Sequence, residues 1–347
     1  MHLRWIALAG GVAGATVAGA GIAASAPRYR GPATDHFDGR RFRNQPPVGR
    51  AGLGEVLRWI ATRRPPPWPE VTGGPAGAPP PREVAGDAMR VTFVNHATAL
   101  VQVEGFHLLT DPIWSTRCGP AGLLGPRRVR PPGVPMRDLP RIDAVLVSHD
   151  HYDHLDLATL RRLDRAHRPR IVTTLGNRGV LVRAGLSRVT ELDWWQRIPL
   201  QAGVSVTCVP ARHFSGRGLL DSDGTLWAGF VVGTPSGKIY FAGDTGAGPH
   251  FARIRRRLGP MRLALLPIGA YLPRSLMEAV HLSPEEAVEA HVTLGAKVSV
   301  GIHYGTFRLA DEGRDAPAGE VEAAVAARPE AQGFRVLGFG EGLDVPA

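Results

Sequence analysis

Residues 148–156 hold four metal-capable side chains within six positions, a density that constrains the chain more than any other feature. The four follow the spacing His-x-His-x-Asp-His and are His149, His151, Asp153 and His154. The run comes directly after the apolar stretch 144–147, which is typical of a buried strand. Extended backbone would point the first two histidines to one side, and a turn at Tyr152 would direct the other two ligands to a second point nearby.

The donor atoms of this run narrow the choice of metal ion. Nitrogen and oxygen donors without a thiolate suit zinc, iron or manganese. A single ion does not need this many ligands from one loop, whereas two neighbouring ions do. We therefore expect a two-metal site. The alternative is a solvated polar loop that happens to be rich in histidine.

Three further candidate ligands each follow a predicted strand. The strands are expected at 204–209, 238–242 and 297–300, and the candidates behind them are His213, Asp244 and His303. Strand ends are rigid and the loops beyond them are open, so functional sites often lie there. A lone histidine in such a place is more often structural. Three such places together with the cluster favour metal ligation.

Several short motifs accompany these residues and narrow the class of protein. Together with the cluster they resemble the metallo-β-lactamase superfamily, and within it the N-acylphosphatidylethanolamine-hydrolysing phospholipase D family and its bacterial relatives. The stretch 266–307 supports this branch most strongly. The motifs are Phe-Asp-Gly-Arg-Arg-Phe at 37–42, Val-Asn-His-Ala-Thr at 94–98, Leu-Thr-Asp-Pro-Ile at 109–113, Glu-Leu-Asp-Trp-Trp at 191–195, Pro-Ala-Arg-His-Phe-Ser-Gly-Arg at 210–217, Leu-Pro-Ile-Gly-Ala-Tyr-Leu-Pro-Arg at 266–274, His-Leu-Ser-Pro-Glu-Glu-Ala at 281–287 and Ile-His-Tyr-Gly-Thr-Phe at 302–307.

The resemblance implies a ligand set for two Zn²⁺ ions per chain, with iron or manganese as alternatives. It assigns His149, His151 and His213 to the first metal. It assigns Asp153, His154 and His303 to the second. Asp244 would bridge the two metals, and Asp153 and Asp244 would also count as catalytic residues. Two neighbouring dications lower the pKa of a shared water toward neutrality, which predicts a metal-bridging hydroxide that attacks phosphorus.

Four other residues are candidates for supporting roles. His281 precedes a strong helix start and resembles a family position near the mouth of the active site, so we expect it to contact phosphate or assist the leaving group. Tyr271 and Arg274 are expected to meet the substrate head group, since arginine suits phosphate. His96 would orient a metal ligand. The alternatives are a capping or surface role for His281 and a backbone-satisfied buried ring for His96.

The fold that the resemblance implies is an αββα sandwich of the α/β class, with two mixed β-sheets flanked by helices. Periodicity by itself indicates only mixed α and β structure. We expect strands at 89–94, 99–103, 106–110, 142–148, 171–174, 188–191, 263–267 and 298–302 and in the section 198–242. We expect helices at 54–62, 157–165, 177–185, 249–258, 284–294 and 319–327.

The N-terminal part of the chain differs from the rest. We divide the chain into a signal peptide or membrane anchor at 1–30, an extension with a Pro/Gly-rich linker at 31–88, and a catalytic domain at 89–345. The uncharged run 5–26 could span a bilayer, and Ala-Ser-Ala at 24–26 resembles a signal-peptidase site. The protein is therefore expected to be exported or membrane-anchored. The alternative is a cytoplasmic protein associated with membranes.

The charge balance is compatible with anionic partners, and the alternative is an ordinary solvated surface that is rich in arginine. The formal net charge is +10, and nearly all of the positive charge is arginine. The basic runs 127–130 and 253–257 lack interleaved aromatic residues, so no nucleic acid is expected. We expect a phospholipid or another anionic phosphodiester as the substrate and a membrane surface as a partner. The sequence is also compatible with a homodimer.

These observations together predict a phospholipase D-type phosphodiesterase that releases N-acylethanolamine or a related alcohol from a phospholipid. Fold does not fix function on such a scaffold. One alternative is a lactone, ester or amide hydrolase that uses the same two-metal site on carbon. An alternative of another class is a membrane-attached, metal-containing binding protein without turnover.

Overall fold

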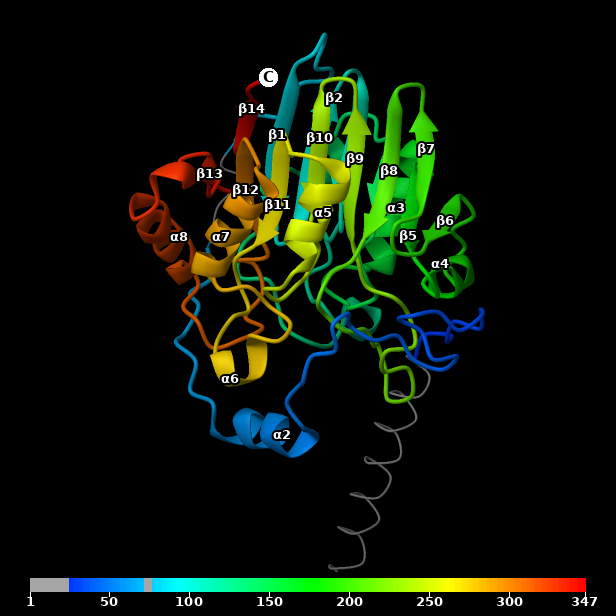
Figure 1. Ribbon diagram of the computed structural model, residues 1–347, viewed down its shortest axis with the longest axis vertical. Coiled ribbons are helices and arrows are strands. Elements are labelled where there is room, and N and C mark those ends of the chain that lie inside the picture. The colour runs from blue at the N-terminus through cyan, green and yellow to red at the C-terminus, as the bar shows by residue number, and fades with distance from the viewer. Residues whose placement is uncertain (1–24, 72–76) are drawn as a thin grey trace, which may run out of the picture.

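The computed structural model describes residues 25–71 and 77–347 and contains two β-sheets that pack face to face (Figure 1). The strands of the first sheet are β1 (Met89–Asn95), β2 (Thr98–Val103), β3 (Phe106–Thr110), β4 (Ala144–Leu146), β5 (Arg170–Thr174), β6 (Val189–Leu192) and β14 (Gly342–Val345). The strands of the second sheet are β7 (Arg197–Gln201), β8 (Val204–Val209), β9 (Gly229–Thr234), β10 (Gly237–Phe241), β11 (Leu263–Pro267), β12 (Val298–Ile302) and β13 (Phe334–Arg335).

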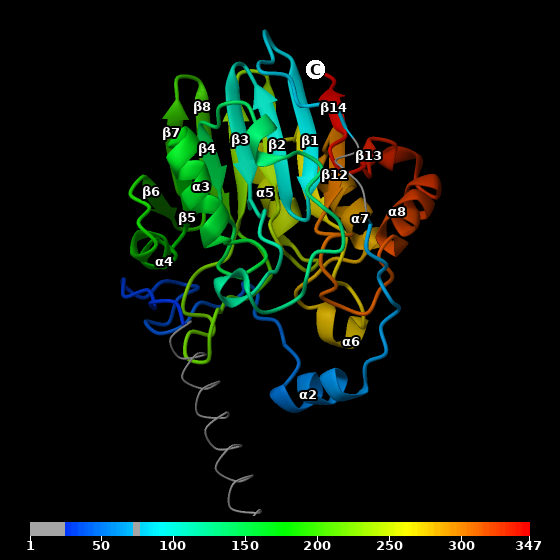
Figure 2. The ribbon, with the colours of Figure 1, turned by 180° about the vertical axis from the view of Figure 1, so that it is seen from behind.

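Helices cover the outer faces of both sheets. The α-helices are α2 (Leu53–Thr62), α3 (Leu157–His167), α4 (Arg178–Arg183), α5 (His250–Leu258), α6 (Arg274–Met277), α7 (Pro284–Leu294) and α8 (Ala316–Ala326), and the short 3₁₀ helices are η1 (Pro120–Gly122), η2 (Met136–Asp138) and η3 (Pro329–Ala331). Helices α5 and α7 lie in front of the second sheet in Figure 1, and α3 lies in front of the first sheet when the molecule is turned round (Figure 2). This arrangement is the expected αββα sandwich.

Each sheet has seven strands, and the strand orders are β14-β1-β2-β3-β4-β5-β6 and β13-β12-β11-β10-β9-β8-β7. Strands β3 to β6 run parallel to one another, as do β10 to β13, while the remaining neighbours are antiparallel. Parallel strands end at the same edge of a sheet, so the loops after them meet there. The candidate site lies at this edge.

The apolar pattern of the first strands explains why they are buried on both faces. In β1, Val91 and Phe93 face the core between the sheets, whereas Val94 faces the core beneath α3 and α4. The same alternation occurs in β2, where Val101 points between the sheets and Leu100 points to the helices. A strand covered on both faces carries a nearly continuous apolar run.

Most expected elements are present, and the differences have local causes. The strand expected at 142–148 is only three residues long, Ala144–Leu146, because the backbone turns from the sheet into the histidine-rich loop. Elements that were not expected include the single turn of helix α6 and the strands β13 and β14, which pair with β12 and β1. In the described part of the Pro/Gly-rich stretch 64–84 there is no helix or strand, as expected.

The N-terminal extension packs against the sandwich. Phe37 and Phe42 are fully buried in the larger hydrophobic core of the molecule, and Tyr29 packs against them. Across residues 25–71 and 77–347 no helix is both long and apolar enough to cross a membrane. Most of the segment predicted to be a signal peptide or anchor, residues 1–24, lies outside the described part of the chain.

An ion pair of the buried His36 ties the extension to the segment between β6 and β7. His36 Nε2 lies 2.7 Å from Asp193 Oδ1 and its Nδ1 lies 2.6 Å from Asp35 Oδ1, while its ring stacks on Trp194. Burial lowers the pKa of His36, but the two carboxylates outweigh burial and the pKa is raised above its usual value. The ion pair therefore stabilises the fold most at pH values below the pKa of the histidine in the unfolded chain, where the ring is protonated in both states.

We predict that His36→Asn lowers the free energy of unfolding by about 1–3 kcal/mol below pH ~6.5. The loss should shrink as the pH rises through the raised pKa of the folded state. Urea unfolding across this pH range measures it. His167→Asn is the control, because burial lowers the pKa of His167 and its contribution should grow with pH. A deficit for His36→Asn that stays constant with pH contradicts the prediction.

Candidate metal centre

Three histidines converge on one point at the edge of the sandwich. Nε2 of His149 lies 2.9 Å from Nδ1 of His151, and Nε2 of His213 lies 3.2 Å from the same atom. The first two come from the loop after β4 and the third from the loop after β8. His149 and His213 are each about 1% exposed. The structure thus brings together the three residues predicted for the first metal.

A second group of donors lies next to the first. Nε2 of His154 and Nε2 of His303 lie 3.2 and 3.3 Å from the same oxygen, Oδ2 of Asp153. His303 follows β12, and its φ of 62° is in the left-handed region, which turns the chain sharply as it leaves the sheet. These are the three residues predicted for the second metal.

Asp244 lies between the two groups. Its Oδ2 atom is 3.2 Å from Nε2 of His154 and 3.1 Å from Nε2 of His303, which belong to the second group. The same oxygen is 3.7 Å from Nε2 of His213, which belongs to the first. A carboxylate in this position can reach metals in both groups, as the bridging prediction requires.

The donor set fits metal ions. Within the described residues, Nε2 of His154 and Oδ1 of Asp244 are buried without a hydrogen-bond partner, and a cation would satisfy both. All clustered donors are nitrogen or oxygen, and the two cysteines, Cys118 and Cys208, are buried, free and outside the cluster. Nitrogen and oxygen donors at these separations suit zinc, iron or manganese.

The electrostatics of the cluster place three of its members in the form that binds metal. Burial raises the pKa of Asp244, but the rings of His154 and His303 outweigh burial and hold it well below its usual value. Burial lowers the pKa of His213 and of His149 well below the usual range. Asp244 is therefore ionised and the rings of His149 and His213 are neutral, which are the forms that bind metal. Burial lowers the pKa values of His154 and His303, but Asp244 and Asp153 outweigh burial. The pKa of His154 is raised well above its usual value and that of His303 to about 9, so these two rings release a proton when they bind metal.

Asp111 is a functional residue that the sequence analysis left without a role. It follows β3, and its Oδ2 lies 2.6 Å from Nδ1 of His154. Ser148 donates to the same carboxylate through its backbone N–H, at 2.7 Å, and through its hydroxyl. A carboxylate behind a ligand histidine fixes the ring and its tautomer. One feature of the sequence could have indicated this role, because Asp111, like the candidate ligands, directly follows a predicted strand.

Asn44 is a second residue that the sequence analysis missed. Its Nδ2 donates to the carbonyl of His213 at 2.9 Å, and the N–H of His213 donates to Oδ1 of Asn44 at 3.1 Å. The ring of His213 is held separately, because its Nδ1 lies 2.9 Å from the carbonyl oxygen of Val280. The N-terminal extension thus fixes the backbone of one candidate ligand. No local sequence pattern at Asn44 indicates this.

His96 lies beside the second group, as expected of a residue that orients a ligand. Its Nε2 is 2.8 Å from Oδ2 of Asp153, and its carbonyl accepts a hydrogen bond of 2.7 Å from the N–H of His303. Burial lowers the pKa of His96 to about 3, so the ring is neutral. The ring is close enough to the group to bind a metal itself, so its orienting role stays a prediction.

His281 connects the metal cluster to a cavity. Its Nδ1 lies 3.8 Å from Oδ2 of Asp244, and burial lowers the pKa of the ring to about 4. The ring lines a cavity of about 810 Å³ whose other walls are mostly apolar. The remaining lining residues are Arg50, Ala51, Val56, Trp59, Phe214, Ser222, Leu276, Met277, Val280 and Leu309. The expected role of His281 toward phosphate or the leaving group stays a prediction.

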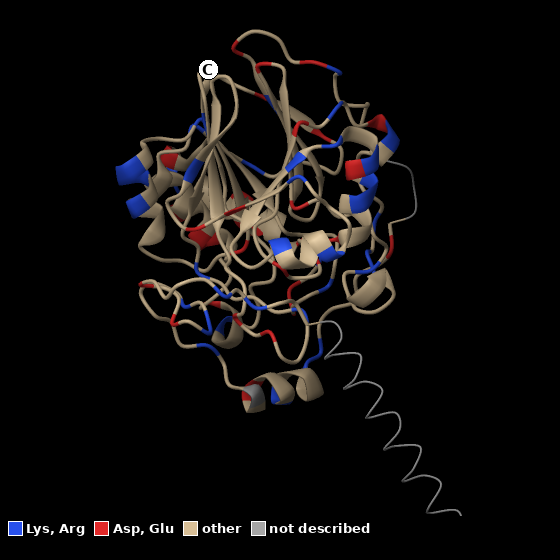
Figure 3. Cartoon of the chain, turned by 90° about the vertical axis from the view of Figure 1, so that its right-hand side faces the viewer, with Lys and Arg blue, Asp and Glu red and all other residues tan. Residues whose placement is uncertain are grey.

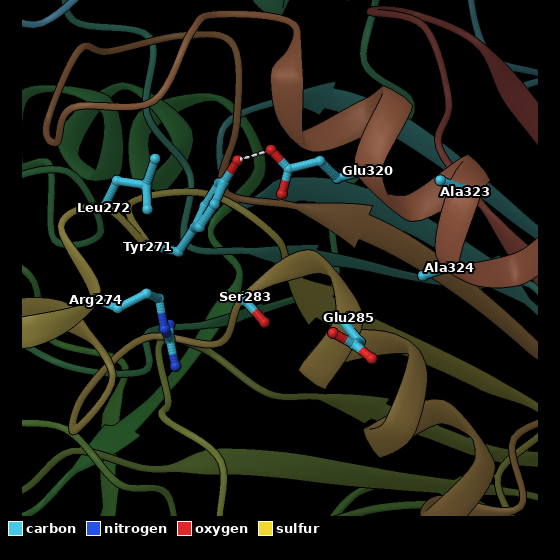
Figure 4. A pocket seen from close by; sticks show the side chains of 8 residues that line it. All are labelled: Tyr271, Leu272, Arg274, Ser283, Glu285, Glu320, Ala323 and Ala324. Atoms are coloured by element: carbon cyan, nitrogen blue, oxygen red, sulfur yellow. Dashed lines mark hydrogen bonds between the residues drawn. The ribbon is translucent and has the colours of Figure 1, made fainter. Parts of the chain in front are cut away.

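Tyr271 and Arg274, which were expected to meet the substrate head group, contact other residues of the chain. The hydroxyl of Tyr271 donates to Glu320 on α8, as Figure 4 shows. Arg274 binds both carboxylate oxygens of Glu286 at 2.8–2.9 Å and donates to the carbonyl of His281 at 3.1 Å. Both side chains line a separate cavity of about 530 Å³ with polar and apolar walls. Their contact with a substrate head group stays a prediction, and the observed contact of Arg274 is with the backbone of His281.

The fold and the donor cluster define the class of a metal-dependent hydrolase. The family model for the beta-lactamase superfamily domain matches residues 107–304, which is more than half of the chain. The chain therefore belongs to the metallo-β-lactamase superfamily.

Its relatives include an uncharacterised protein of Mycobacterium tuberculosis, which is 43% identical over 257 residues, covering 72% of this chain and 68% of the relative. The N-acyl-phosphatidylethanolamine-hydrolyzing phospholipase D 1 of Caenorhabditis elegans is 41% identical over 229 residues, covering 63% of this chain and 64% of that protein. Among solved structures, the metallo hydrolase Igni18 of Ignicoccus hospitalis superimposes with a TM-score of 0.58 at 22% identity, covering 75% of this chain and 99% of that one. This last likeness confirms the fold.

We predict that Asp111→Asn weakens zinc binding by about 10–100-fold, because His154 loses the carboxylate that orients its ring. Competition with a zinc-binding dye measures the affinity, and circular dichroism checks the fold. Asp143→Asn is the matched control, since Asp143 also accepts a backbone hydrogen bond, from His107, at the start of β4. Equal zinc affinity in the Asp111 variant and the wild type contradicts the orienting role.

Proposed function

We propose that the protein is a binuclear zinc phosphodiesterase of the phospholipase D type, which releases N-acylethanolamine or a related alcohol from a phospholipid. The observation that carries this proposal is the cavity of about 810 Å³ that begins at His281, beside the donor cluster, and is walled by apolar side chains. The name of the Caenorhabditis elegans relative gives the same activity for that protein.

The shape of the site suits a substrate with one polar and one apolar part. Phe214, Leu276 and Met277 line the cavity and would contact acyl chains. The cluster at its inner end is polar and would contact the phosphodiester. An apolar cavity of this size exceeds what a small polar ester or lactone needs, which favours the phospholipid over the hydrolysis of such compounds.

The chain's own residues have distinct roles in the proposed reaction. The donors His149, His151 and His213 would hold one zinc and Asp153, His154 and His303 the other, with Asp244 between them. When bound, two zinc ions supply Lewis acidity and lower the pKa of water toward neutrality. His281 is close enough to the cluster to form a hydrogen bond with a phosphoryl oxygen or the departing oxygen.

In the overall reaction the oxygen of water becomes bonded to phosphorus, and the bond from phosphorus to the head-group oxygen breaks. The alcohol leaves with a proton, and phosphatidate remains. The membrane association and the exported or anchored location expected from the sequence form part of the same proposal, because the substrate resides in a bilayer.

We predict that the purified protein hydrolyses N-acylphosphatidylethanolamine, that a chelator abolishes turnover, and that added zinc restores it. A panel of lactones and carboxylic esters, assayed in parallel, tests the alternative hydrolases. Faster turnover of a lactone or ester than of any phosphodiester contradicts the proposal. Bound zinc without turnover of either class indicates a binding protein.

We also predict that Asp244→Asn lowers phosphodiester turnover by at least about 10²-fold while the fold is retained, because the cluster loses its central negative charge. Steady-state kinetics and thermal unfolding measure the two effects. Asp143→Asn, which changes a carboxylate away from the cluster, should keep its activity. Unchanged turnover in the Asp244 variant would remove this carboxylate from the mechanism.

A further inference from the structure

Two loops that carry candidate ligands are joined directly by hydrogen bonds. The loop after β8 carries His213, and the loop after β10 carries Asp244. The N–H of Gly246 donates to the carbonyl of Arg212 at 2.8 Å, and the N–H of Arg212 donates to the hydroxyl of Thr245 at 2.9 Å. The residue before one candidate ligand is therefore bonded to the two residues after the other.

The sheet itself does not join these two loops. Strand β9 lies between β8 and β10 in the strand order, so no ladder of backbone hydrogen bonds connects the strands that lead to His213 and Asp244. The guanidinium of Arg212 adds a contact between the loops, because it donates to the carbonyl of Ala247. A Cβ atom on Gly248 would lie 2.3 Å from Cδ of Arg212, so a larger residue there would push the arginine away.

The hydroxyl of Thr245 is the centre of this contact. Thr245 is fully buried, and its hydroxyl donates to the carbonyl of Gly246 at 3.0 Å while it accepts from the N–H of Arg212. Nε2 of His250, at the start of α5, lies 3.1 Å from the same hydroxyl oxygen. A hydroxyl has one proton to donate and two lone pairs, so these three partners use its full capacity.

This hydrogen bonding fixes the tautomer of His250. Because the proton of Thr245 goes to Gly246, Nε2 of His250 must donate, and its Nδ1 is buried without a hydrogen-bond partner among the described residues. Basic residues lie mostly on the helices and loops around the sheets (Figure 3). Burial, and then the charges of Arg212 and Arg253, lower the pKa of His250 to about 3, so the ring is neutral.

The separation of these loops decides whether one carboxylate can serve both groups of donors. Oδ2 of Asp244 lies 3.1 Å from Nε2 of His303 and 3.2 Å from Nε2 of His154, but 3.7 Å from Nε2 of His213. An opening between the two loops would lengthen the last of these distances and leave the first group without Asp244. Ligands must be held within about 0.5 Å of their working positions by the residues around them.

We propose that Thr245 and His250 are positioning residues of the metal centre, because the hydrogen bonds of the Thr245 hydroxyl hold the loop of Asp244 against the loop of His213. His250 acts through Thr245, whose hydroxyl it keeps oriented toward both loops. The inference rests on the binuclear site of the proposed function and is independent of the substrate.

The test measures zinc binding to the full chain by competition with a zinc-binding dye. Thr245→Val keeps the shape of the side chain without the hydroxyl, and we expect it to bind zinc about tenfold more weakly. Thr245→Ser keeps the hydroxyl and should retain the wild-type affinity. Thr174→Val is the matched control, because the buried hydroxyl of Thr174 donates to the carbonyl of Leu226 and accepts from Asn177, away from the candidate ligands.

Thermal unfolding of the metal-free chain separates positioning from general stability. Thr245→Val and Thr174→Val both lose buried hydrogen bonds, so both should unfold at a lower temperature than the wild type. Only Thr245→Val should lose zinc affinity. Wild-type zinc affinity in Thr245→Val, equal weakening in Thr174→Val, or equal weakening in Thr245→Ser overturns the proposal.

Variants of His250 provide an independent result. His250→Leu removes the donor and should weaken zinc binding, whereas His250→Gln can place an amide N–H near the position of Nε2 and should bind zinc more tightly than His250→Leu. The double variant Thr245→Val/His250→Leu should bind zinc no more weakly than Thr245→Val alone, because the two residues act through one hydroxyl. Additive losses, or wild-type affinity in His250→Leu, contradict the role of His250.

The outcomes distinguish this inference from the proposed function. If the wild type binds zinc and the Thr245 and His250 variants behave as expected, but no phosphodiester is hydrolysed, the proposed function fails and the positioning role stands. If the wild type hydrolyses the phosphodiester and Thr245→Val binds zinc as tightly as the wild type, only the positioning role fails. A wild type that binds no zinc overturns both.

Discussion

The rest of this structure depends on one interaction, the close packing of largely buried nitrogen and oxygen donor atoms. Seven nitrogen and oxygen donors from four loops meet where the two sheets end, and two of them are carboxylates held in the ionised form. Such a group is costly to bury without positive charge. The sandwich, its short strands and the sharp turns at their ends are the means by which these atoms are held together.

Hydrogen bonds from neighbouring residues hold the candidate ligands in position. Asp111 holds the ring of His154, and Asn44 holds the backbone of His213. Asp150, which the sequence left without a role, accepts hydrogen bonds from the N–H of Gly216 and the hydroxyl of Thr225, so it joins the loop of the first ligands to the loop beyond His213. A rigid surrounding of this kind keeps ligand geometry constant before any metal binds.

The sequence was informative where the chemistry is local. His149 to His154 lie within six positions, and the isolated candidates each follow an apolar run, so strand ends could be located and their convergence expected. Contacts between distant segments carry no such signal. Asn44 lies 169 positions from the residue it supports. Arg274 donates to both carboxylate oxygens of Glu286 on the neighbouring helix, a contact that its local sequence does not indicate.

The hydrogen bonds of Asn44 limit where the sandwich could be separated from the N-terminal extension. The family match begins at residue 107 and β1 begins at Met89, so a minimal unit drawn from either boundary would omit Asn44. The main chain of His213 would then lose both of its anchors. The sandwich and the N-terminal extension thus share the support of one candidate ligand, and a unit cut between them would separate that ligand from its support.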